Sequence, residues 1–128
     1  MRRLIAVSAV LLSLVSCATP RNGLNTASAS CFRALPAAEA SVRHKGTLVG
    51  VRKIASAELS GKVPQLSQAG AGMVCAIAFR AAFEPGDVVA ADPPGPGGFA
   101  LVVLDAEGSR VLATSVLTTL PVRFHHRA

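Results

Sequence analysis

The stretch "MVCAIAFRAAF", residues 73–83, decides the fold, because its side chains alternate with the two-residue period of a β-strand. One face of this strand carries the larger apolar side chains, which are those of Met73, Cys75, Ile77 and Phe79. The opposite face carries those of Val74, Ala76, Ala78 and Arg80. The heavier face contains Cys75, and we expect a helix to cover that face.

The segment "CFRALPAAEASVRHKG", residues 31–46, predicts that helix. Three of its apolar residues recur at the spacing of one helical face, namely Leu35, Ala38 and Val42. Pro36 is compatible only with the first turn, so the helix should begin between residues 33 and 35. Gly46 is expected to end the helix, with His44 in its last turn.

Further strands are predicted on both sides of residues 73–83. Residues 47–55 are rich in β-branched and aliphatic side chains, as strands are. Residues 99–104 are apolar on both faces, which indicates a central strand, and the turn from Asp105 to Gly108 should join them to a second hairpin strand. Residues 120–124 are a candidate for a short edge strand.

Two segments rich in glycine and proline are predicted to be irregular. Residues 56–72 contain three glycines and a proline, and we expect a loop there. Residues 84–98 should form a long exposed loop, since the prolines and glycines at its end disfavour both helix and ladder. Residues 92–98 could be a contact loop or polyproline II ligand, or simply a solvated connector. Glu84 and Asp87 fit turn chemistry rather than acid–base catalysis.

The predicted fold is therefore α+β, with one short N-terminal helix packed on a small, mostly antiparallel sheet of three to five strands. The closing hairpin "VVLDAEGSRVL", residues 102–112, resembles the last hairpin of PepSY-type modules, which commonly reads V-D-x-x-T-G-x-V. Glu107 stands where that pattern has threonine. The resemblance covers about half of the domain and implies no functional residue.

The N-terminus has the layout of a secretory signal. Arg2 and Arg3 precede an apolar run over residues 4–15 that is short for a bilayer-spanning helix. The run ends in Leu14-Val15-Ser16-Cys17, which resembles the lipobox of bacterial lipoprotein precursors. This resemblance implies that residues 1–16 are removed and that Cys17 is diacylglyceryl-modified at the new N-terminus. The alternative is an ordinary secretory signal with a chance cysteine.

A lipid on Cys17 would tether the protein to a membrane outside the cytoplasm, since two or more acyl chains give stable anchoring. Residues 17–30 then form the lipidated end and a flexible tether, residues 31–124 the domain, and residues 125–128 an exposed tail. Because Arg2 and Arg3 leave with the signal, the net charge falls from +6 to +4. The remaining charges form no basic stripe with interleaved aromatics, so nucleic acid is not expected as a partner.

With Cys17 assigned to lipid, Cys31 and Cys75 remain as an even pair in an oxidising compartment. We predict a structural disulfide between them. A free thiol or a labile redox pair is the alternative.

Chemistry-bearing motifs are sparse. No serine has a G-x-S-x-G context, no glycine-rich segment has phosphate-binding order, and we expect neither an enzyme nor a cofactor. The metal candidates are His125, His126 and His44, although adjacent residues on an extended segment point to opposite sides. We therefore expect a non-enzymatic binding or structural lipoprotein of the cell envelope, with the membrane and an envelope protein as partners. A small-ligand or metal-binding lipoprotein that uses His125 and His126 is the alternative.

Overall fold

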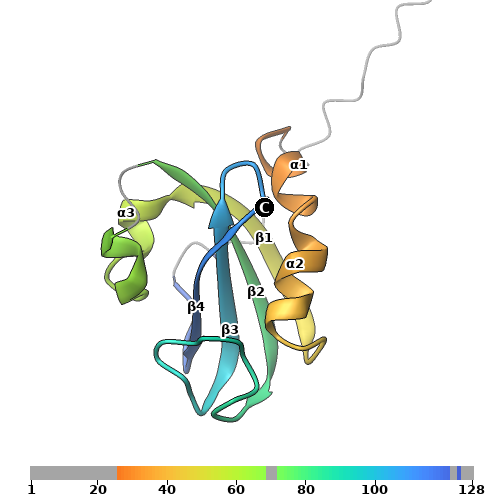
Figure 1. Cartoon of the computed structure of the whole chain (residues 1–128), viewed down its shortest axis with the longest axis vertical. Helices are drawn as coiled ribbons and strands as arrows, with labels where there is room; N and C mark the ends of the chain where they lie inside the picture. Colours follow the sequence, from red (N-terminus) through yellow and green to blue (C-terminus); the bar gives the residue numbers. More distant parts are fainter. Residues whose placement is uncertain (1–25, 69–71, 122–123, 125–128) are drawn as a thin grey trace, which may run out of the picture.

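The computed structural model describes residues 26–68, 72–121 and 124. It has an α+β fold, in which a four-stranded antiparallel sheet lies between two helical layers (Figure 1). The strands follow the order of the chain: β1 (Thr47–Ala55), β2 (Met73–Phe83), β3 (Gly97–Asp105) and β4 (Val111–Leu117). The predicted fold class is confirmed, and the sheet lies within the expected range of three to five strands.

The alternation predicted for β2 divides the core into two clusters, one on each face of the sheet. Cys75, Ile77 and Phe79 belong to the first cluster. Val74, Ala76 and Ala78 belong to the second. Met73 is the exception, because its side chain at the end of the strand is exposed. β3 is buried on both faces, as predicted for a central strand.

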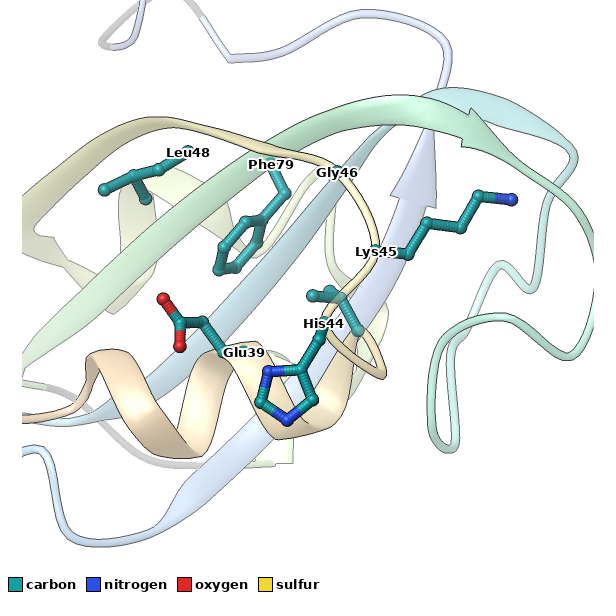
Figure 2. Close-up of a pocket in the computed structure, with 7 residues that line it drawn as sticks. Glu39, His44, Lys45, Gly46, Leu48 and Phe79 are labelled. Atoms are coloured by element: carbon teal, nitrogen blue, oxygen red, sulfur yellow. The ribbon is translucent and has the colours of Figure 1, made fainter.

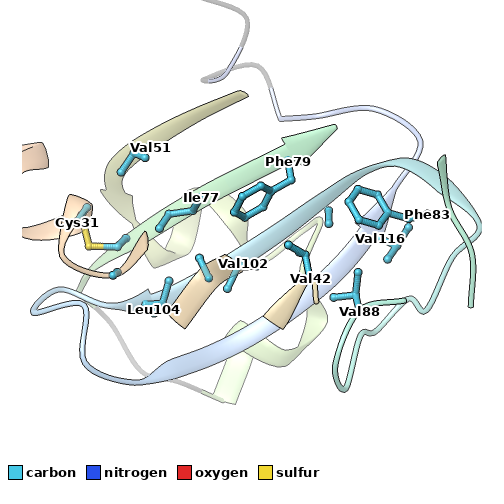
Figure 3. Close-up of a cluster of buried hydrophobic side chains, with 14 residues drawn as sticks. Cys31, Val42, Val51, Ile77, Phe79, Phe83, Val88, Val102, Leu104 and Val116 are labelled. Carbon is cyan, nitrogen blue, oxygen red and sulfur yellow. A yellow bond between two sulfur atoms is a disulfide. The ribbon is translucent and has the colours of Figure 1, made fainter. Parts of the chain in front are cut away.

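Helices α1 (Thr26–Phe32) and α2 (Leu35–Ser41) cover the first face (Figures 1 and 3). α2 begins at Leu35 with Pro36 in its first turn, as predicted. The sequence predicted one helix, whereas the structure has two consecutive segments, because Pro36 has no N–H to continue the bonding of α1. α1 also begins at Thr26, so residues 26–30, which we assigned to the tether, are helical.

The end of α2 differs from the prediction. The helix ends at Ser41, and the N–H of His44 closes it by donating to the Glu39 carbonyl at 2.8 Å. His44 lies beyond the helix rather than in its last turn. Gly46 does not end the helix either. It lies where the chain enters β1, at φ +95°, and a Cβ there would lie 2.8 Å from the Arg80 carbonyl oxygen.

The second face is covered by the segment that we predicted to be irregular, and that prediction is wrong. Residues 56–68 contain the one-turn helix α3 (Ser56–Leu59) and the 3-10 helix η1 (Pro64–Gln68). Leu59, Val63 and Leu66 are buried against the sheet in the second cluster. The sheet thus has an apolar layer on each side.

The 84–98 segment is largely exposed, as predicted, but it runs along the outer edge of β4. The N–H of Asp92 donates to the Thr114 carbonyl, and the N–H of Val116 donates to the Pro93 carbonyl, both at 2.9 Å. The segment also ends earlier than predicted, because Gly97 already pairs with Phe83 in the β2–β3 ladder. A Cβ at Gly97 would lie 2.6 Å from the Leu117 carbonyl oxygen, so only glycine fits there.

The hairpin between β3 and β4 has the predicted turn. Gly108 has a φ of +71° and its N–H donates to the Asp105 carbonyl at 2.9 Å. The edge strand predicted at residues 120–124 is not found in the described part of that stretch. Leu120 and Pro121 lie outside any strand, and the N–H of Phe124 closes a 3-10 turn on the Pro121 carbonyl. No helix of the described residues is long and apolar enough to cross a membrane.

Candidate functional site

The predicted disulfide is present. It joins Cys31 in α1 to Cys75 in β2, with Cα atoms 5.3 Å apart and a sequence separation of 44 residues. Both cysteines are fully buried in the first cluster (Figure 3). The bridge therefore fixes the N-terminal helical layer to the second strand of the sheet, as a structural disulfide does.

Three residues that we singled out lie outside the described part of the chain. They are Cys17, the predicted lipidation site, and the two metal candidates His125 and His126. The third metal candidate, His44, is described. Among the described residues, no group of three His, Cys, Asp or Glu side chains converges as a metal site would require. Metal binding through His125 and His126 stays a prediction.

His44 lines a shallow pocket of about 230 Å³ between α2 and the start of β1. Val42 and Phe79 lie on its apolar side, and Leu48 forms part of its wall. Figure 2 shows the Glu39 carboxylate and the His44 imidazole at the α2 side, whereas the Lys45 side chain points away from the pocket.

The backbone around this pocket is strained. Arg43 and His44 both have left-handed conformations, with φ of 54° and 58°. Such conformations are uncommon for residues other than glycine and cluster at functional sites. The turn they form places the start of β1 beside α2.

The Lys45 side chain makes an ion pair and a ring contact on the far side of this turn. Its Nζ lies 2.7 Å from Oδ2 of Asp87 and 5.8 Å from the centre of the Phe83 ring. The hydrogen bond from Lys45, together with one from the Glu84 N–H, lowers the pKa of Asp87. This pair links the α2–β1 turn to the 84–98 segment. The N–H of Glu84 donates to Oδ2 of Asp87, and the N–H of Asp87 donates to the Glu84 carbonyl, so the two residues form a turn as predicted.

A second hollow of about 190 Å³ adjoins the first and is lined by Thr47, Leu48, Val49 and Arg80. Leu48 and Val49 are adjacent and are 40% and 38% exposed. The β1–β2 register shifts between Leu48 and Gly50, so a bulge sits here. We call Thr47–Lys53 with these two hollows the β1 edge.

Positive charge gathers around the β1 edge. Arg52 and Lys53 lie on β1 itself, Arg43 precedes it, and Arg80 pairs with Thr47 from β2. Arg80 also lies 5.4 Å from the centre of the Phe99 ring. Within the described residues, none of these four cations makes an ion pair. Glu39 is the carboxylate that lines the adjoining pocket.

Comparison with known proteins adds no relative: no protein family, no curated protein and no solved structure matches this chain. The β1 edge is therefore identified from its own chemistry, which combines exposed aliphatic side chains, cations and a strand at the border of the sheet.

Sequence reasoning located β1 but missed its role as a candidate site. The signal was the pair Leu48-Val49 followed by Arg52-Lys53 within one predicted strand. Its meaning depends on which strand lies at the border of the sheet, and that is a tertiary property. The 92–98 loop, which we considered as a contact segment, instead lies against the other border through Asp92 and Pro93.

Proposed function

We propose that the protein is a bacterial lipoprotein of the cell envelope, anchored by a lipid on Cys17, whose domain is a non-enzymatic binding module. The observation that carries this proposal is the lipobox-like Leu14-Val15-Ser16-Cys17 at the end of an uncharged apolar run. A lipid at this position would tether the domain to an extracytoplasmic membrane face.

The disulfide supports this location, because such bonds persist in oxidising compartments and are rare in the cytosol. The modest positive charge of the processed chain supports it as well, since cations near a membrane surface are attracted to anionic headgroups.

The support for binding is the β1 edge. The exposed side chains of Leu48 and Val49 keep apolar area in contact with water at this border. A partner that covers these side chains would remove that area from water.

The anchor is tested by intact mass and by metabolic labelling with a radioactive fatty acid. We expect the full chain to lose residues 1–16 and to gain the mass of a diacylglyceryl group at Cys17, with or without a further acyl chain. The Cys17→Ser variant should carry no fatty-acid label and should retain the signal peptide, residues 1–16. Ser16→Ala is the matched control, because it keeps a small residue before Cys17 and should be labelled normally. An unmodified Cys17 in a chain that retains it would contradict the proposal.

A further inference from the structure

We infer that the β1 edge is a docking site for an extended, acidic segment of another protein, which adds to the sheet as a fifth strand next to β1. This inference rests on the proposed binding function and specifies its partner. Strand addition of this kind takes affinity from main-chain hydrogen bonds and specificity from side-chain pockets.

The first argument is that β1 is an open border of the sheet. In the described part of the chain, β1 pairs with β2 on one side and with no strand on the other. Among the described residues, one hydrogen bond reaches the β1 backbone from outside the β1–β2 ladder, and its donor is the guanidinium of Arg52 itself, at 3.2 Å from the Val51 carbonyl oxygen. Within residues 26–68, 72–121 and 124, the other outward backbone groups of β1 have no backbone partner and can pair with a new strand.

The second argument is the contrast with the opposite border. The β4 edge is covered by the chain itself, through bonds from Asp92 and Val116 on the backbone. The side chains of Thr114 and Ser115 add two more, to the carbonyls of Val89 and Asp92 at 2.6 and 2.7 Å. Open strand edges invite aggregation, and proteins generally protect them. Among the described residues, the chain covers the β4 border with its own backbone, whereas the β1 border carries a bulge and cations but no covering segment.

The third argument concerns the side chains that a new strand would meet. Leu48 lies between the two hollows and contributes to both. Alternate side chains of an added strand point to opposite faces. An apolar side chain of the partner could therefore cover Leu48 on the face of α2.

The fourth argument is charge. Arg52 pairs with Ala76 and Lys53 with Cys75, so the two cations lie on opposite faces of β1. β1 contains no carboxylate, and pairing with a second copy of the same edge would add cations without supplying an anion. Like charges on adjacent strands are destabilising and opposite charges are stabilising. The same cations thus disfavour self-association and select an acidic segment.

The probe is a short peptide of alternating valine and glutamate, added to the full chain in neutral detergent micelles. Fluorescence anisotropy of the labelled peptide gives the affinity, and hydrogen exchange reports which amides become protected. We expect saturable binding with protection confined to β1 among the strands. A peptide with the same side chains but with alternate amides N-methylated should not bind, because it cannot complete a ladder.

Two protein variants with the same change in net charge separate a local contact from general attraction. Arg52→Glu should weaken peptide binding about tenfold or more, because it replaces an attraction by a repulsion. Lys62→Glu, at an exposed turn on the helical layer of the second face, should leave the affinity within about twofold. Arg52 is half-buried at a sheet border, so circular dichroism should confirm that Arg52→Glu is folded.

Several results would overturn the inference. They are an absence of peptide binding, equal binding of the N-methylated peptide, equal weakening by both variants, or protection outside β1. Micelles that contain phosphatidylglycerol test whether a membrane surface covers the β1 edge instead. If these micelles protect the β1 amides and the peptide does not bind, the inference is also overturned. Acylation of Cys17 is read from the mass beforehand, so failure of the anchor is distinguishable from failure of the docking site.

Discussion

Cys31 in α1 and Cys75 in β2 lie with their Cα atoms 5.3 Å apart, and the chain between them contains α2, β1, α3 and η1. The bond therefore constrains elements of both helical layers. By the chain-entropy estimate, a closed loop of this length stabilises the folded state by about 4 kcal/mol.

The first prediction concerns this bond. Reducing it, or replacing both cysteines in Cys31→Ala/Cys75→Ala, should lower the free energy of unfolding by about 4 kcal/mol, because the unfolded chain gains freedom. Urea titration with and without reductant measures the change. The double variant is the control, since reductant should have no effect on it. Identical midpoints for the oxidised and reduced chain would refute the prediction.

The second prediction uses two adjacent glycines. Gly97→Ala should destabilise the protein by about 2 kcal/mol or more, because its Cβ would be forced against the Leu117 backbone and the β3–β4 pair would have to shift. Gly98→Ala meets nothing within 4 Å and should be neutral or stabilise by about 0.5 kcal/mol. Thermal unfolding of the two variants compares them directly. Equal losses in both would show that the close approach at Gly97 has no energetic consequence.

The third prediction concerns the cover of the β4 edge. Thr114→Val keeps the shape of this buried side chain but removes its hydrogen bond to the Val89 carbonyl, which should lower stability by about 1–3 kcal/mol. Hydrogen exchange should rise around residues 89–93 before it rises in the central strands. Thr118→Val, at an exposed position, is the matched control. Unchanged exchange in Thr114→Val would count against this role.

The fourth prediction is a pH dependence at the β3–β4 turn. The Ser109 hydroxyl, and then the backbone N–H groups of Ser109 and Arg110, donate to Asp105 and lower its pKa. A carboxylate with a lowered folded pKa contributes stability above its unfolded pKa of about 3.9, and this contribution is lost as the pH falls through the folded pKa. The urea concentration at the unfolding midpoint should therefore decrease as the pH is lowered below about 4.

Asp105→Asn should flatten part of that decline, because the group no longer titrates. Ser109→Ala should flatten it less, since the backbone donors remain. Asp87, whose pKa is also lowered, is present in the wild type and in both variants, so it contributes the same pH dependence of stability to all three. Parallel urea midpoints against pH for the wild type and Asp105→Asn would exclude the role of Asp105.

The sheet was predictable from the sequence because its strands carry local signals. Alternation over residues 73–83 assigned Cys75, Ile77 and Phe79 to the face that α1 and α2 cover, and Gly108 marked the hairpin turn. The disulfide followed once Cys17 was set aside, since two cysteines allow one pairing.

The second helical layer was missed although a signal existed. Leu59, Val63 and Leu66 recur at helical spacing, and all three are buried. Gly61 and Pro64 interrupt the pattern, so the segment forms two short helical pieces rather than one helix. The candidate site was missed for another reason: Leu48 and Arg80 come together only when β1 and β2 pair, and the sequence does not state which border remains uncovered.

The position of the second layer inside the disulfide loop affects how the protein would respond to proteolysis. Gly61 lies in an exposed turn between α3 and η1, on the chain between Cys31 and Cys75. A protease that cuts this turn would yield two pieces that remain covalently joined and travel as one band until reductant separates them. A single nick there would add the mass of one water molecule to the chain and release nothing.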